Sequence, residues 1–165
     1  MKKLVIVRHA KSDWGVGAGR DFDRPLNGRG LHDVPRMSNF LRGQGITPDL
    51  ILSSPAVRAL TTARFFAEPP GFAATPLVVV DSLYLTDVPH VLDVLAGVDA
   101  ESGTVMLVGH NPTQTLLLNY LTDEMIEDMP TCGVAVVDFP HAASWQELSR
   151  SAGVLAALYF PKQDL

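Results

Sequence analysis

The sequence predicts an α/β fold of three layers, in which helices cover both faces of a mostly parallel six-stranded sheet. Six short apolar runs are continuous rather than alternating, which is typical of strands buried on both faces. Segments with helical periodicity separate most of these runs. The last two runs have no long helix between them, so we expect the last strand pair to be antiparallel. The six runs are residues 4–7, 50–53, 77–80, 105–109, 134–139 and 154–160.

Helix-start signals place a helix in each of four connections between these strands. Each signal is a residue whose side-chain oxygen can accept a hydrogen bond from the first turn of a helix. Twice a proline follows, which suits the first helical position. The four N-cap residues are Asn27, Ser54, Asp87 and Asn111, and the prolines are Pro55 and Pro112.

Length and composition fit one globular domain that spans residues 1–165. Apolar residues make up 47% and charged residues 19% of the chain. The net charge of -5 disfavours nucleic acid and membrane surfaces as partners, because both attract basic proteins. The single cysteine, Cys132, excludes an internal disulfide, which favours an intracellular protein, and we expect a cytoplasmic one.

Four side chains that suit an anion stand at the carboxyl ends of predicted strands. Arg8 and His9 follow the first strand, and His110 follows the run 105–109. Arg58 lies in the first turn of the helix after the second strand. Ligands of open α/β sheets bind at this edge, so we expect the four side chains to meet there. Arginine forks and free amides at helix starts match phosphate oxygens, which predicts a phosphate pocket.

A histidine that faces phosphorus can also be a nucleophile that forms a covalent phosphoenzyme. His9 must then be neutral at the attacking nitrogen. A hydrogen bond from its other ring nitrogen to a backbone carbonyl would select that tautomer, and neighbouring arginines should lower its pKa. Taken alone, the pair Arg8 and His9 is equally well explained as a polar strand end, and Arg58 as a solvated helix residue. The set of four favours the pocket.

The segments VRHAKSDW, DFDRPLNGRG, PDLILSSPAVRALTTA and VGHNP, in this order, resemble the histidine phosphatase superfamily. They are most similar to its small SixA-type phosphohistidine phosphatase branch. The resemblance covers about residues 4–112 and implies a phosphoglycerate mutase-like fold, a phosphatase reaction and no metal. We expect no cofactor.

The resemblance also implies roles for single residues. His9 matches the nucleophile that becomes phosphorylated, and Arg8 and Arg58 match the arginines that clamp the phosphate. His110 matches the second pocket histidine, which hydrogen-bonds the phosphoryl group. Arg24 matches a further phosphate-contacting arginine, with a surface turn as the alternative reading.

Two departures from the superfamily pattern bear on the substrate. Ala10 stands where glycine is usual, which is tolerable if this position needs no positive φ. No glutamate follows the third predicted strand, where many members place an acid–base residue. Asp87 is a candidate acid there, with a helix cap as the favoured role. A weak or absent acid fits phosphohistidine, because its P–N bond is labile.

We therefore expect a metal-independent phosphatase that acts on phosphohistidine in a protein, such as a phosphotransfer domain, through phospho-His9. The alternatives are a small-molecule phosphomonoesterase of the same superfamily and a catalytically weak phosphate-binding module. The partner is then a phosphorylated protein or small molecule, not nucleic acid or a membrane. The glycine-rich segment 15–19 has neither dinucleotide-binding nor P-loop spacing, so we expect a flexible loop near the pocket mouth.

Overall fold

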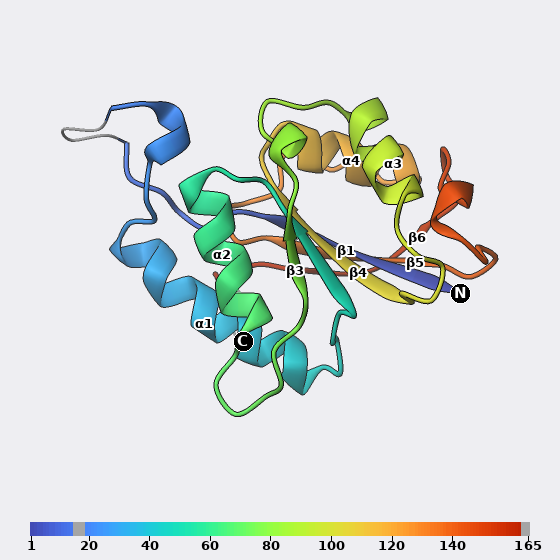
Figure 1. Cartoon of the computed structure of the whole chain (residues 1–165). Helices are drawn as coiled ribbons and strands as arrows, with labels where there is room; N and C mark the ends of the chain where they lie inside the picture. The colour runs from blue at the N-terminus through green and yellow to red at the C-terminus, as the bar shows by residue number, and fades with distance from the viewer. Residues whose placement is uncertain (15–18, 163–165) are drawn as a thin grey trace.

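One six-stranded sheet forms the centre of the molecule (Figure 1). The computed structural model describes residues 1–14 and 19–162. The strand order is β3-β2-β4-β1-β5-β6. The loop predicted for the glycine-rich segment falls largely on residues 15–18, which lie outside the described residues, and stays a prediction. The strands are β1 (Lys2–Arg8), β2 (Leu50–Ser53), β3 (Leu77–Val79), β4 (Thr104–Gly109), β5 (Val134–Phe139) and β6 (Val154–Tyr159).

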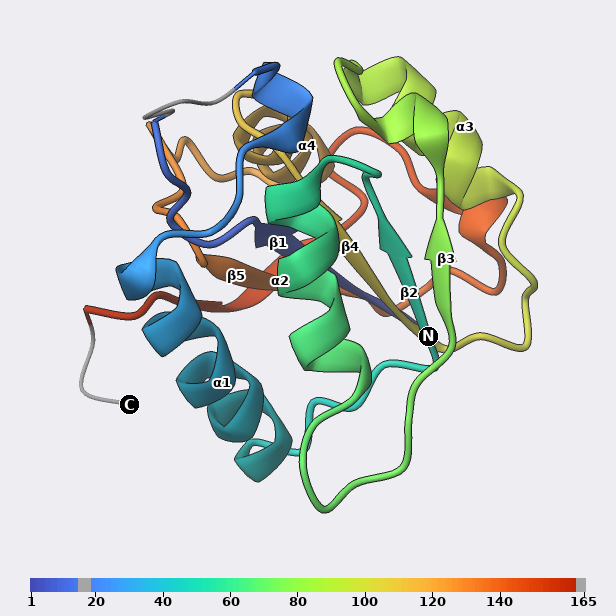
Figure 2. The same cartoon turned by 60° about the vertical axis from the view of Figure 1, so that its left-hand side comes forward.

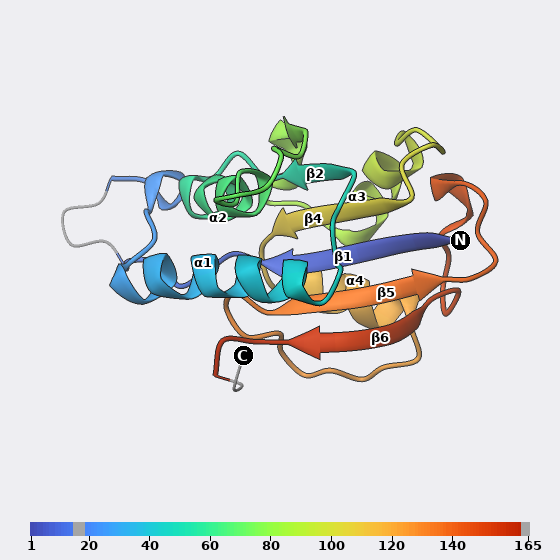
Figure 3. The same ribbon diagram turned by 90° about the horizontal axis from the view of Figure 1, so that it is seen from below.

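The sheet is parallel apart from β5, which runs antiparallel to both of its neighbours, β1 and β6 (Figure 3). The predicted antiparallel last pair is confirmed. The reversal already begins at β1, because the chain before β5 returns to the edge where β1 ends. There the backbone N–H of Cys132 donates to the carbonyl oxygen of His9 over 3.0 Å, so β5 starts beside the end of β1 and runs back.

Helices cover both faces of the sheet, which confirms the three-layer prediction. Helices α1 and α2 pack on one face, and α3 and α4 pack on the other (Figure 2). None of the helices in the described part of the chain is both long and apolar enough to cross a membrane. The helices are α1 (Gly28–Gly43), α2 (Val57–Ala67), α3 (Val88–Ala96) and α4 (Thr113–Leu121), with short 3-10 helices η1 (Asp21–Asp23), η2 (Asp81–Leu83) and η3 (Trp145–Glu147).

Strand β1 shows why its sequence is apolar without alternation. Leu4 and Ile6 belong to the core cluster that includes α4, whereas Val5 and Val7 belong to the cluster on the α1 and α2 side. All four side chains are fully buried. Successive side chains of a strand point to opposite faces, and here both faces are covered. The central strand is therefore a rigid support for whatever follows its last residue.

Two of the four predicted N-caps are confirmed. The side chain of Asn27 accepts a hydrogen bond from the backbone N–H of Gly30 at the start of α1. The side chain of Asp87 accepts one from the N–H of His90 at the start of α3. These caps satisfy amides that have no partner within the helix.

The predicted cap at Ser54 is wrong. Helix α2 begins at Val57 with Ala56 as the N-cap residue, so Pro55 is not its first residue either. The Ser54 hydroxyl accepts from the N–H of Ala56 at 3.3 Å and lies 2.8 Å from Nε2 of His110. The Ser54 side chain, which the local pattern predicts as a helix cap, is thus in contact with His110, a residue far away in the sequence.

The helix start predicted at Asn111 is shifted by one residue. Helix α4 begins at Thr113 with Pro112 as the N-cap residue. The Asn111 side chain still caps it, because Oδ1 accepts hydrogen bonds from the backbone N–H and the hydroxyl of Thr115. This places His110 in the turn directly before the helix.

Candidate active site

The two histidines of the predicted pocket follow neighbouring parallel strands. Arg8, the last residue of β1, pairs with Gly109, the last residue of β4. The backbone N–H of His9 continues the ladder by donating to the carbonyl oxygen of Gly109 at 3.0 Å. The ring centroids of His9 and His110 are 5.3 Å apart. The register of β1 against β4 therefore brings the two imidazoles together.

His9 is held in one tautomer. Its Nδ1 lies 2.7 Å from the carbonyl oxygen of Ala10, and since a carbonyl only accepts, Nδ1 carries the proton. The lone pair is then on Nε2. The side chain is 7% exposed, and burial lowers its pKa to about 3, with smaller contributions from nearby positive charge. At neutral pH His9 is therefore an uncharged imidazole with an unprotonated Nε2.

Ala10 fits its position without strain. It is fully buried against α2, where its backbone N–H donates to the hydroxyl of Thr62 at 3.1 Å. It is not among the positive-φ residues of the described chain. A glycine is therefore not required after the histidine.

His110 is also neutral and bound on one side. Its Nε2 lies 2.8 Å from the hydroxyl oxygen of Ser54. Its Nδ1 is buried and has no hydrogen-bond partner within the described chain. Burial, and then the charge of Arg58, lower its pKa to about 4. The ring therefore offers an uncharged nitrogen to a ligand beside His9.

Arg8 and Arg58 already use some of their guanidinium donors in hydrogen bonds with backbone carbonyl oxygens. Nη1 of Arg8 donates to the carbonyl oxygen of Met129 at 2.6 Å. Arg58 is 6% exposed and donates from Nη1 to the carbonyl oxygen of Asp21 at 2.7 Å. The buried Nε atoms of both arginines lack a hydrogen-bond partner within the described chain. Unpaired guanidinium donors that are buried need an acceptor, and a phosphate oxygen is one.

Arg24 belongs to the same pocket and is not a solvated turn residue. It is 8% exposed, and its Nε donates to the carbonyl oxygen of Asp13 at 3.0 Å. Its guanidinium carbon lies 3.8 Å from the centroid of the Trp14 ring, in a cation–π contact. Its Nη1 donates to Oδ1 of Asp21 at 2.7 Å. The alternative reading of a surface turn does not describe its position.

The sequence did not indicate two members of this cluster, Asp21 and Tyr84. The Tyr84 hydroxyl donates to Oδ2 of Asp21 at 2.7 Å, and the same oxygen accepts from Nη2 of Arg58 at 3.0 Å. The bond from Tyr84, followed by those from Arg24 and Arg58, lowers the pKa of Asp21 to about 2. The one available sequence signal was the spacing of Asp21 three residues before Arg24. The carboxylate joins two of the arginines that suit phosphate.

The two histidines, the three arginines and Asp21 line a pocket of about 260 Å³ at the carboxyl ends of the strands, and Tyr84 contacts Asp21 from outside it. Asp87 does not line it, and its carboxylate is used as the N-cap of α3. Within the described residues no group of three or more His, Cys, Asp or Glu side chains is arranged to hold a metal ion. The pocket is lined by Arg8, His9, Lys11, Ser12, Trp14, Asp21, Arg24, Arg58, His110, Asn111 and Thr131.

The chain is similar to curated proteins over nearly its whole length. The model of the histidine phosphatase superfamily (branch 1) matches residues 4–84. An uncharacterised protein of Mycobacterium tuberculosis is 30% identical over 166 residues, which cover 94% of this chain and 100% of the relative. The matched family segment includes Arg8, His9, Arg24 and Arg58.

Solved structures agree with this result. A protein of Agrobacterium tumefaciens assigned as the phosphohistidine phosphatase SixA is 28% identical, with a TM-score of 0.80 over 97% of this chain and 98% of its own. A SixA protein of Nakamurella multipartitia, assigned in the same way, is 25% identical, with a TM-score of 0.82 over 98% and 97% of the two chains. The predicted fold class is confirmed. With the paired histidines, the arginine cluster and these relatives, the chain belongs to the histidine phosphatase superfamily.

Proposed function

We propose that this protein is a metal-independent phosphatase that removes phosphate from phosphohistidine on a protein by way of phospho-His9. The observation that carries the proposal is the orientation of His9. Its Nδ1 donates to the Ala10 carbonyl oxygen over 2.7 Å, which leaves Nε2 as an unprotonated nucleophile in a pocket shared with Arg8 and Arg58. A phosphate-binding module needs the arginines but no such nucleophile, so that alternative is disfavoured.

In the proposed reaction Nε2 of His9 attacks phosphorus, and the bond from phosphorus to the leaving imidazole nitrogen breaks. The electron pair of that bond stays on the leaving nitrogen, which takes its proton from solvent. Water then attacks the phosphorus of phospho-His9 and gives up a proton to solvent. The bond from phosphorus to Nε2 breaks, its electron pair returns to Nε2, and inorganic phosphate is released. Hydrogen bonds from Arg8, Arg58 and His110 would stabilise the negative charge on the phosphoryl oxygens.

The acid–base groups of the pocket favour a leaving group that needs little help. Asp21 is the one carboxylate among the described residues that line the pocket. Its pKa of about 2 keeps it ionised at neutral pH, so it cannot donate a proton. An alkyl phosphate ester needs a proton on its leaving alkoxide, whereas the P–N bond of phosphohistidine is labile. The pocket therefore suits phosphohistidine better than an alkyl ester.

The surroundings of the pocket support a protein substrate. Trp14, which lines the pocket, is 78% exposed. Leu85, which follows Tyr84 in the sequence, is 85% exposed. Exposed large apolar side chains around a site are typical of surfaces that bind proteins. The similarity to two proteins assigned as SixA phosphohistidine phosphatases supports the same substrate class.

The test is transfer of labelled phosphate from a phosphohistidine protein, with the reaction stopped in alkali because phosphohistidine is labile in acid. We expect the label on His9, and we expect His9→Ala to lose turnover by roughly 10⁴-fold or more. Activity should persist after treatment with a chelator. Near wild-type turnover of His9→Ala would exclude this mechanism.

A small-molecule phosphomonoesterase is the second candidate, because a further cavity of about 190 Å³, which shares Arg58 and His110 with the phosphate pocket, could hold a small leaving group. A panel of phosphohistidine proteins, phosphoserine, phosphotyrosine, aryl phosphates and sugar phosphates separates the two candidates. The protein substrate is excluded if an aryl or sugar phosphate is hydrolysed far faster than every phosphohistidine protein.

A further inference from the structure

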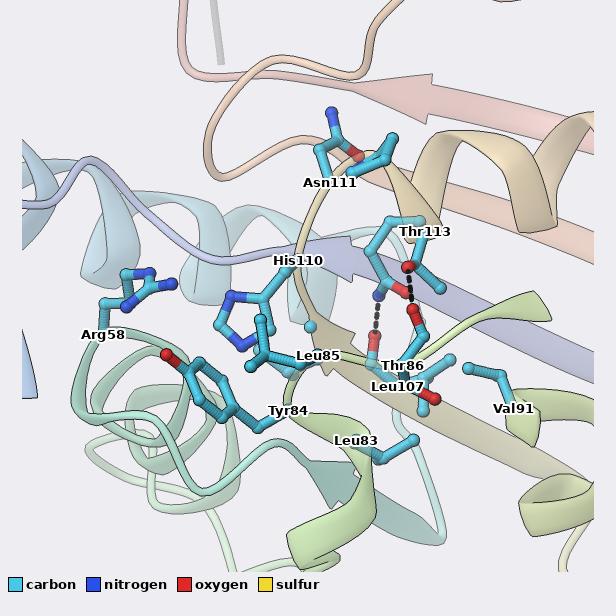
Figure 4. A pocket seen from close by; sticks show the side chains of 14 residues that line it. Arg58, Leu83, Tyr84, Leu85, Thr86, Val91, Leu107, His110, Asn111 and Thr113 are labelled. Atoms are coloured by element: carbon cyan, nitrogen blue, oxygen red, sulfur yellow. Dashed lines mark hydrogen bonds between the residues drawn. The ribbon is translucent and has the colours of Figure 1, made fainter. Parts of the chain in front are cut away.

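A second cavity of about 190 Å³ adjoins the phosphate pocket (Figure 4). It lies between the segment from η2 to α3 and the turn from β4 to α4. Leu83, Leu85, Val91 and Leu107 form much of its apolar wall, and Tyr84 and Thr86 also line it. Apart from Arg58 and His110, its lining residues have no role in the proposed phosphoryl transfer.

The two cavities share Arg58, His110 and Asn111. Figure 4 shows His110 between Arg58 and the apolar side chains that continue the wall. A phosphoryl group bound by Arg58 and His110 therefore has this cavity beside it. A group attached to that phosphorus is within reach of the cavity.

The walls favour a weakly polar occupant. Arg58 alone carries a charge among the described lining residues, and much of the wall is aliphatic or aromatic. A sugar would bring several hydroxyls that need hydrogen-bond partners, and burial without them is unfavourable. The buried hydroxyl oxygen of Thr86 has no hydrogen-bond partner within the described chain, so one polar atom of an occupant can be satisfied there.

The volume suits a single ring. A cavity of about 150 Å³ with apolar walls holds one benzene molecule. The present cavity is of similar size, and it opens toward solvent beside Leu85, which is 85% exposed. A five- or six-membered ring fits within this volume.

We propose that this cavity is a leaving-group subsite for one flat, weakly polar ring, with the Thr86 hydroxyl bonding to a ring nitrogen. The proposal rests on the proposed function, because it places the ring that leaves phosphorus. An imidazole meets both requirements, whereas a phenyl ring meets the requirement for a flat, weakly polar ring but forms no bond with Thr86. The subsite predicts a preference for ring-bearing phosphoryl compounds over those without a ring.

Binding of two phosphonates tests the subsite without any need for turnover. Methylphosphonate and phenylphosphonate carry the same anionic group, and their P–C bonds are not hydrolysed. Isothermal titration calorimetry gives the ratio of their dissociation constants. Val91→Phe fills the cavity from α3, where Val91 is 1% exposed. Val94→Phe on the same helix is the matched control, since Val94 does not line the cavity.

We expect wild type to bind phenylphosphonate more tightly, by roughly 10- to 200-fold, as is usual for filling an apolar pocket. Val91→Phe should remove most of this preference, and Val94→Phe should retain it. Val91→Leu, a smaller change, should reduce the preference in part and serves if Val91→Phe does not fold. Equal binding in wild type, or a preference that survives both Val91 variants, overturns the subsite.

The failure of the subsite is distinguishable from that of the proposed function. A phenyl preference without labelling of His9 leaves the subsite in place and removes the phosphatase mechanism. Labelling of His9 without a phenyl preference supports the phosphatase mechanism and removes the subsite. Thr86→Val, which removes the hydroxyl at nearly constant volume, should weaken imidazole-bearing inhibitors while phenylphosphonate binding is retained.

Discussion

Oδ2 of Asp21 accepts a hydrogen bond from Nη2 of Arg58 at 3.0 Å, inside the pocket that suits phosphate. The Asp21 carbonyl oxygen accepts a second bond from the same guanidinium, from Nη1 at 2.7 Å. The Asp21 residue thus orients the arginine fork, and its negative charge also opposes that of a bound phosphate. These two effects should separate in kinetics.

We expect Asp21→Asn to bind inorganic phosphate more tightly and to turn over more slowly. Loss of the carboxylate charge should lower the inhibition constant of phosphate by roughly tenfold, because about 1.4 kcal/mol of repulsion is removed. Loss of the ion pair with Arg58 should lower kcat by a similar factor. Steady-state kinetics with phosphate as inhibitor measures both. Tyr84→Phe, which removes one of the bonds to Asp21, should lower kcat less, and an unchanged inhibition constant in Asp21→Asn would contradict the charge effect.

His9 and His110 should stay neutral across the physiological range, because burial lowers their pKa values to about 3 and about 4. Nitrogen-15 NMR of labelled histidine should show a protonated Nδ1 and an unprotonated Nε2 in His9 at neutral pH. His9→Gln and His110→Gln identify the signals. A titration of either ring near its unperturbed pKa of about 6.5 would contradict the buried, neutral assignment.

The same shift should make the fold sensitive to acid. A histidine in the unfolded chain binds a proton near pH 6.5, whereas His9 in the folded chain resists protonation until about pH 3. Its contribution to stability is therefore fully present above about pH 6.5 and is lost as the pH falls toward about 3. Urea unfolding at several pH values should show a steeper decline for wild type than for His9→Gln. Parallel declines would exclude this linkage.

Ser54→Ala should slow turnover through His110. The substitution removes the hydroxyl that lies 2.8 Å from Nε2, and the loss of one such bond corresponds to roughly tenfold in kcat. The pH dependence of kcat should change as well, because His110 loses the hydroxyl that bonds to its Nε2 and helps to select its tautomer. Ser53→Ala is the control, since that buried hydroxyl donates to the Ser54 carbonyl oxygen instead. Equal effects of the two substitutions would indicate general destabilisation only.

Gly30→Ala should disturb the loop after His9. A Cβ at this position would lie well inside van der Waals contact of the Lys11 carbonyl oxygen, which also accepts a hydrogen bond from the N–H of Asn27. Such overpacking costs roughly 1–3 kcal/mol, and the displaced loop should also lower kcat. Gly28→Ala is the matched control in the same helix, because nothing lies within 4 Å of its added Cβ. Thermal melts and kinetics of the two variants check this, and equal stability would contradict the close approach.

The sequence predicted the positions of the strands, but burial on both faces holds for the inner strands and is wrong for the edge strands β3 and β6, which are partly exposed because each has a neighbouring strand on one side only. The runs at Leu4 and Val105 are apolar without interruption, and both are strands whose ends carry the two histidines. The caps at Asn27 and Asp87 were predictable because each hydrogen bond joins two residues that are only three positions apart in the sequence.

Contacts between distant segments could not be predicted in this way. Ser54 reaches His110 across 56 positions, and Tyr84 reaches Asp21 across 63. Each contact depends on the order of the strands in the sheet, and a local sequence pattern does not predict that order. The missing glutamate after the third strand directed attention to Asp87, whereas Tyr84, three residues earlier, contacts the pocket carboxylate.

The pairing of Arg8 with Gly109 bears on which parts of the sequence can be altered without moving the two histidines. The spacing of neighbouring hydrogen-bonded strands, about 4.8 Å, is common to all sheets and does not depend on the loops. The strand pairing itself places one histidine beside the other. The segments around Trp14 and Leu85 can then be exchanged or lengthened while the reacting groups keep their separation. Reaction and substrate choice are carried by different parts of the chain, so a new preference can be engineered at the periphery.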